Sequence, residues 1–239
     1  MGVMYAHLRM AAVAGLAFLG LATGLGLPLS SDALSEQQLQ AALLNPVDFP
    51  EGWASDSERS ARQRGFGVPN PTEDSCKQLF DSKEDTTAKA GFARTRSGPF
   101  VTTVLTSHED AAEARGEFAR FREQAHNCRT IHTREGPRGN ARPVAYRAED
   151  MDVRKLGEES AAVRYERRGG AGTDSGEVVA EVVIARVDSH LVRVAQAGRA
   201  DGGGQDVEAI AERAVEKLEQ VCDGHLPTPS PNQPGTTDL

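Results

Sequence analysis

The sequence predicts an α+β fold, in which an antiparallel sheet of about five to six strands carries helices packed on one face. Two patterns predict it. Apolar periodicity gives the order helix, helix, two strands, helix, four strands, helix, without the strand–helix alternation of a parallel sheet. Apolar and charged residues also alternate over 160–168, with Ala161, Val163 and Tyr165 on one side and charged residues on the other. This alternation is typical of an antiparallel strand with one buried and one solvent-exposed face.

Four segments have helical patterns. Residues 36–44 follow Ser35, a suitable N-cap, and stop near Pro46. A second, short helix carries Cys76. The two longest helices show apolar stripes at three- and four-residue spacing over 111–125 and 205–221.

Six segments have strand patterns. Residues 88–96 and 99–107 are expected to pair across a turn at Ser97-Gly98. Four strand candidates follow: 142–149, 160–168, 177–187 and 190–197. The third is apolar at nearly every position, which is typical of a central strand, and a turn at Asp188-Ser189 makes a hairpin of the last two.

The first 33 residues have the pattern of an export signal. Arg9 precedes residues 10–29, which contain no charge, and small residues follow, so we expect cleavage after Ala33. The alternative is an uncleaved anchor, since twenty uncharged residues can just span a bilayer. Either form places the chain outside the cytoplasm, secreted or anchored to the outer face of the cytoplasmic membrane.

Two further segments look unlike packed structure. Residues 223–239 contain four prolines and few apolar residues, so we expect a disordered Pro-rich tail. Residues 51–74 lack apolar periodicity and are expected to form a long loop. The predicted domain therefore extends over residues 34–222.

Charge excludes some functions. The 239 residues contain 35 acidic and 27 basic side chains, a net charge of −8. Proteins that bind nucleic acid, and polybasic proteins that bind a membrane surface, carry the opposite balance. The stretch with Arg129, Arg134, Arg138 and Arg142 could attract an anion, but interleaved acids favour a solvated edge.

No motif for catalysis or a cofactor is present. The Gly-rich stretches 169–172 and 202–204 lack the Lys-Ser/Thr of a phosphate-binding loop and are expected to be connectors. Adjacent acids at 149–152 and 158–159 are expected to be solvated turns. The remaining histidines, His108, His190 and His225, are expected at the surface. We expect no catalytic residue and no cofactor.

The three cysteines indicate a disulfide. An exported chain is oxidised, and Cys76, Cys128 and Cys222 allow three single pairings. The segment 126–132 (HNCRTIH) combines His and Cys, which zinc prefers, but its spacing matches no zinc motif. We therefore expect no metal there.

One resemblance extends these interpretations. The segments 42–53 (ALLNPVDFPEGW), 76–80 (CKQLF) and 101–112 (VTTVLTSHEDAA), with Phe118 and Cys128, resemble the PknH-like extracellular sensor domain. This family occurs in actinobacterial kinase ectodomains, lipoproteins and exported proteins of the cell envelope. The likeness implies an antiparallel sheet, helices on one face and a cleft for an unidentified ligand.

The resemblance also assigns the cysteines. It implies a Cys76–Cys128 disulfide, which leaves Cys222 as a free thiol or, less simply, an intermolecular partner. The family's second disulfide joins two later strands, and residues 177–187 and 190–197 contain no cysteine. No kinase domain is present, so any sensing role needs a partner protein.

Three functions remain open. The first is an exported, non-catalytic ligand-binding or sensor-like module that recognises a small ligand or envelope component. The second is an extracellular hydrolase whose site forms only in three dimensions. The third is a structural envelope protein. We favour the first.

Overall fold

The computed structural model describes residues 33–84, 86–137, 139–168, 177–200 and 206–227. The predicted signal or anchor (all but Ala33), most of the predicted tail and both Gly-rich stretches lie outside these residues. None of the described helices is long and apolar enough to cross a membrane.

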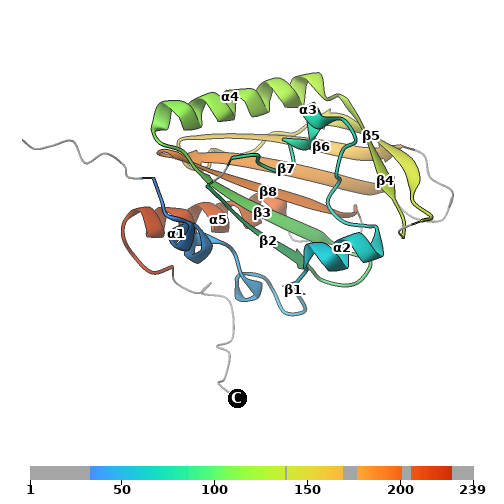
Figure 1. Cartoon of the computed structure of the whole chain (residues 1–239), viewed down its shortest axis with the longest axis horizontal. Helices are drawn as coiled ribbons and strands as arrows, with labels where there is room; N and C mark the ends of the chain where they lie inside the picture. The colour runs from blue at the N-terminus through green and yellow to red at the C-terminus, as the bar shows by residue number, and fades with distance from the viewer. Residues whose placement is uncertain (1–32, 85, 138, 169–176, 201–205, 228–239) are drawn as a thin grey trace, which may run out of the picture.

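The core of the molecule is one antiparallel sheet of eight strands in the order β1-β2-β3-β8-β7-β6-β5-β4 (Figure 1). Each strand pairs only with an antiparallel neighbour. The strands are β1 (Ala54–Ser55), β2 (Thr87–Ala93), β3 (Phe100–Ser107), β4 (Thr130–Glu135), β5 (Arg142–Asp150), β6 (Glu159–Arg168), β7 (Val178–Val187) and β8 (His190–Arg199).

The α+β class is confirmed, but the strand count was too low. The six predicted strands correspond to β2, β3 and β5 to β8. The sequence did not indicate β1, which has two residues, or β4, where Ile131 is the one aliphatic residue. The expected loop at 51–74 contains β1 and the helix α2 (Glu58–Arg64).

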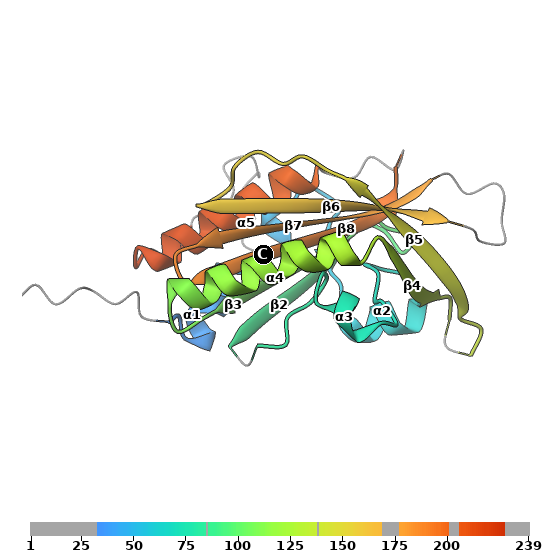
Figure 2. The same ribbon diagram turned by 90° about the horizontal axis from the view of Figure 1, so that it is seen from above.

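Helices cover both faces of the sheet, so the prediction of a single helical layer was wrong. Figure 1 shows α3 (Asp74–Lys77) and α4 (Ala111–Asn127) on one side, with α1 (Glu36–Ala42) and α5 (Val207–Cys222) on the other. Viewed from above, α4 lies over the central strands (Figure 2). We call the side covered by α4 the α4 face.

The central strands account for this second layer. Along β7, Val182 and Ile184 belong to the apolar core under α4, whereas Val183 and Ala185 belong to the core with α1 and α5. A strand that is apolar on both faces needs a cover on each, because otherwise half of its apolar surface would stay in water.

The segment NPVDFPEGW, which carries part of the family resemblance, has a structural role. Asn45 caps the 3-10 helix η1 (Pro46–Asp48), and Phe49 stacks on Trp53 with ring centroids 4.9 Å apart. The buried Asp48 carboxylate accepts hydrogen bonds from Lys217 and Arg213 of α5, at 2.8 and 3.1 Å. The motif therefore fixes the chain to α5.

Candidate ligand-binding groove

A segment of the chain connects the two edges of the sheet. We call residues 56–73 the bridging segment; it includes α2. At one end, the Asp56 amide donates to the Gly91 carbonyl of β2 at 2.7 Å. At the other end, the Thr72 amide donates to the His132 carbonyl of β4, also at 2.7 Å. The segment thus spans from the β1–β2 edge to β4.

Gly65 forms a third attachment, which no other residue could form. Its carbonyl accepts from the Gly136 amide at 2.8 Å, just beyond β4. The φ angle of Gly65 is +72°, and a Cβ there would lie 1.8 Å from the Gly136 carbonyl oxygen. Only glycine adopts this conformation cheaply and permits so close an approach.

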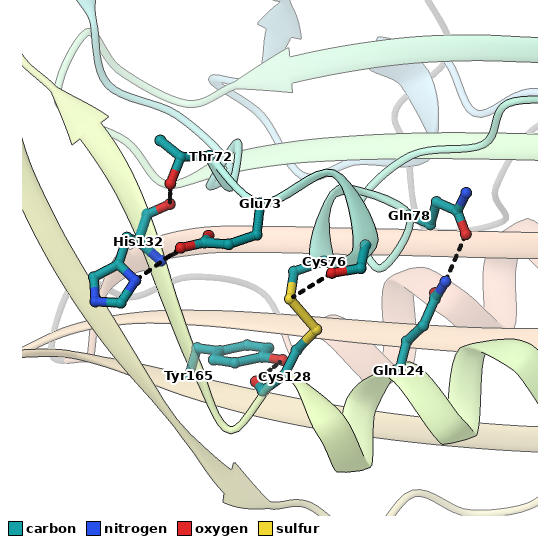
Figure 3. Close-up of a disulfide and its surroundings, with 9 residues drawn as sticks. Thr72, Glu73, Cys76, Gln78, Gln124, Cys128, His132 and Tyr165 are labelled. Atoms are coloured by element: carbon teal, nitrogen blue, oxygen red, sulfur yellow. Dashed lines mark hydrogen bonds and ion pairs between the residues drawn. A yellow bond between two sulfur atoms is a disulfide. The ribbon is translucent and has the colours of Figure 1, made fainter.

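A disulfide between Cys76 and Cys128 fixes the chain immediately after the bridging segment (Figure 3). It joins α3 to the residue that follows α4, and both cysteines are buried. The Glu73 carboxylate lies 2.9 Å from Nδ1 of His132. The Tyr165 hydroxyl donates to the Cys128 carbonyl at 3.0 Å.

The bridging segment encloses a groove on the α4 face with a volume of about 1530 Å³. Its floor is formed by β2 and β3, where Thr102 pairs with Ala195 of the core under α4. One wall is the end of β4 and the residues after it, and α3 with Phe80 closes one end. The roof is the bridging segment itself, which contributes Ser57, Ser60 and Phe66.

Opposite charges pair along this groove. Arg64 forms two hydrogen bonds to the Asp56 carboxylate, at 2.8 and 3.2 Å, and its guanidinium lies 4.1 Å from the centroid of the Phe100 ring. Lys89 binds Asp81 at 2.6 Å. Glu135 accepts from Arg167 of β6 at 2.8 Å. Each of the three acids that line the groove therefore has a basic partner.

A buried ion pair supports the floor beneath α4. Arg193 of β8 lies 3.5 Å from the Glu117 carboxylate of α4 and also donates to the carbonyl of Asp81. Burial lowers the pKa of Arg193, and the nearby Glu117 opposes that effect. The contact fixes α4 and the chain after α3 to the same strand.

The cysteines are arranged as the family resemblance implied. The Cys76–Cys128 disulfide is present, and Cys222 at the end of α5 forms no disulfide. Burial, with Asp188 and Asp223 nearby, raises the pKa of the Cys222 thiol to about 11. Since the thiolate is the reactive form, this thiol is poorly suited to nucleophilic chemistry.

Two of the histidines expected at the surface are buried. His108 is 4% exposed and His190 is 2% exposed, where β3 and β8 meet, whereas His225 is exposed as predicted. Burial lowers the pKa of His190 to about 4. The Leu34 amide donates to the Ser107 hydroxyl at 2.9 Å, so the chain before α1 helps to cover this end of the sheet.

The HNCRTIH segment does not assemble a metal site. Cys128 is committed to the disulfide, His126 is exposed, and His132 contacts Glu73. Among the described residues, no three His, Cys, Asp or Glu side chains are grouped so that they could hold a metal ion.

Several of the remaining charged candidates have partners of their own. Arg186 pairs with both Glu158 and Glu159, and Arg129 pairs with Asp150. Arg134 donates to the Ala141 carbonyl at 2.6 Å, Arg142 is exposed, and Arg138 lies outside the described residues. The predicted anion-attracting stretch is therefore not brought together as one site.

Sequence reasoning missed the groove because its roof has no periodic pattern. The available signals were two glycines and two prolines, Pro69 and Pro71, within residues 65–71. Such residues indicate turns and irregular structure between regular elements. Nothing in the order of elements shows that these edges are joined.

Comparison with known proteins supports the fold. No family model and no curated protein matches the sequence. Among solved structures, the extracellular domain of PknH from Mycobacterium tuberculosis matches with a TM-score of 0.56 at 12% identity. The match covers 81% of this chain and 100% of the PknH domain. The chain therefore shares its fold with the extracellular domain of PknH.

Proposed function

We propose that this chain is a non-catalytic ligand-binding module that acts outside the cytoplasm in a sensor-like role. The observation that carries the proposal is the groove under the bridging segment, whose roof is attached to both sheet edges and followed directly by a disulfide. A site fixed in this way is largely formed before a ligand arrives, which reduces the entropy cost of binding.

The pairing of charges supports binding over catalysis. A general base needs a free proton acceptor with a pKa suited to its task. Asp56, Asp81 and Glu135 instead each accept from a basic side chain. These contacts hold the groove walls in place.

The disulfide supports a location outside the cytoplasm. Disulfides persist in oxidising compartments and are rare in the cytosol. The uncharged stretch at 10–29 agrees with export, in either a secreted or an anchored form. The similarity in fold to an extracellular kinase domain supports the same location. Signalling would then require a partner protein.

Filling the groove tests the proposal. Thr102 lies half-exposed on its floor, so Thr102→Phe would occupy the space with a residue that strands tolerate. Protein isolated from its own cells is measured by native and denaturing mass spectrometry. We expect the wild type to retain a non-covalent bound mass and Thr102→Phe to lose it.

Thr130→Phe is the matched control, because Thr130 is an exposed strand residue of β4 outside the groove lining. This variant should keep the bound mass. The proposal fails if the wild type carries no bound mass, or if Thr102→Phe retains it while folded.

A further inference from the structure

We infer that the groove binds an amphiphilic anion, in which a carboxylate or phosphate group is attached to an apolar body. This inference rests on the proposed function and adds the chemical class of the ligand. Three observations support it: two arginines of the groove lack an acidic partner, one of them is already held in position, and an exposed aromatic ring belongs to the same lining.

The groove has an excess of positive charge. Its three acids are each paired with a basic side chain. Arg59 of α2 and Arg134 of β4 also line the groove, and neither has a carboxylate partner among the described side chains. Lys77 lines it too, and its partner Asp74 is 82% exposed and outside the lining. An anion can therefore approach the two arginines without separating an ion pair of the protein.

The two arginines come from elements that meet. Arg59 belongs to α2, whose capping residue Gly65 hydrogen-bonds to Gly136, two residues beyond Arg134. Arg134 donates to the carbonyl of Ala141, which is itself part of the lining. That bond positions the guanidinium at the groove and uses one of its five N–H donors. The planar guanidinium matches the paired oxygens of a carboxylate or phosphate.

Phe66 supplies an apolar surface in the same groove. Its side chain is 47% exposed, and among the described residues only Phe66 and Leu226 are large apolar side chains left exposed. The apolar residues Val68, Pro69 and Phe80 line the groove with it. Covering such surface with the apolar body of a ligand is favourable. A small inorganic anion would leave it in water, so the lining favours an amphiphilic acid.

The overall charge of the chain does not exclude an anion in this groove. The net charge of −8 is distributed over the whole sequence. At physiological ionic strength, exposed charges more than about 8 Å apart are largely screened from each other. The groups that decide the interaction are therefore those of the lining itself, where the acids are paired and the two arginines are not.

The test compares amphiphiles of matched chain length that differ in their head group. Decanoate and decyl phosphate are the anions, decyltrimethylammonium is the cation, and acetate and inorganic phosphate are the head groups alone. Each is titrated below its critical micelle concentration into the wild-type protein, and backbone amide NMR signals report binding. We expect at least one anionic amphiphile to shift the signals of Phe66, Gly91 and Thr102 saturably. It should bind about tenfold more tightly, or better, than the cation or its own head group.

Substitutions test the two parts of the site. Arg59→Gln and Arg134→Gln should each weaken binding of that amphiphile about tenfold, the loss expected for one charge-assisted hydrogen bond. Arg115→Gln is the matched control and should bind as the wild type does, because Arg115 is an exposed arginine of α4 outside the groove lining. Phe66→Ala should weaken binding of the amphiphile and leave that of the bare head group unchanged.

The inference is overturned if no anionic amphiphile shifts the groove signals, or if the cation or a bare head group binds as tightly. It is also overturned if both arginine variants bind as the wild type does. If the bound mass of native protein is still lost in Thr102→Phe, the binding function stands and only the ligand class is wrong.

Discussion

At the scale of single residues, Gly65 gives the sharpest prediction. Gly65→Ala places a methyl group against the Gly136 carbonyl at a φ angle of +72°. We expect it to destabilise the protein by about 2–3 kcal/mol, since strain and displacement of the attachment to β4 add together. Urea unfolding of purified protein measures the change.

Gly52→Ala separates the cost of backbone strain from the cost of displacing the attachment to β4. Gly52 has a φ angle of +93°, and a Cβ there would meet nothing within 4 Å. This variant should cost only about 1 kcal/mol, the penalty for the backbone conformation alone. Equal losses in the two variants would mean that the close approach to Gly136 is unimportant.

The buried histidines show what single residues in a sequence cannot reveal. His108 stands before a pair of acids, and His190 follows a Ser at a hairpin turn, so both patterns favour solvent. Their burial depends on β3 pairing with β8 and on the chain near Leu34 crossing that end. These contacts join residues more than 70 positions apart, beyond the reach of local pattern.

At the scale of elements, the contact between η1 and α5 is predicted to contribute strongly to the stability of the fold. Asp48→Ala leaves the Lys217 ammonium, whose side chain is 3% exposed, buried without its carboxylate partner. The expected loss is about 3–5 kcal/mol, because an uncompensated buried charge is costly. Chemical denaturation measures it.

Asp74→Ala is the control for that experiment. The Asp74–Lys77 pair is similar in chemistry but solvent-exposed, so its removal should leave stability nearly unchanged. A loss in Asp48→Ala no larger than in this control would show that Asp48 does not fasten η1 to α5.

The elements also show how far the sequence could predict the fold. The helix α5 and the strand β6 were predictable because their apolar residues repeat at one period, and β7 was predictable because it is apolar at nearly every position and is followed by a turn that leads into β8. The residues of β4 (TIHTRE) have no strand pattern of their own. They form a strand because they hydrogen-bond to β5 on one side and to the bridging segment on the other. The groove was unpredictable for the same reason: its walls meet only in the folded chain.

At the scale of the whole molecule, His190 predicts acid sensitivity. Burial lowers its pKa to about 4 in the folded protein, where Asp188 opposes and His108 adds to the effect. An unfolded histidine has its ordinary pKa near 6.5. The unfolded chain therefore binds the proton first, and stability falls as the pH drops from about 6.5 towards 4.

Urea midpoints across that pH range test the prediction. His190→Gln should show a shallower decline than the wild type, because the titrating ring is gone. His225→Gln removes an exposed histidine and should decline as the wild type does. Parallel curves for the wild type and His190→Gln would contradict the assignment.

The pairing of β3 with β8 has a consequence for how the chain is made. Thr103 lies opposite Val194, so the strands β1 to β3 can join the rest of the sheet only after a segment about ninety residues later has been synthesised. Contacts so distant in sequence close slowly. Most of this polypeptide must therefore be synthesised before its central strands can pair.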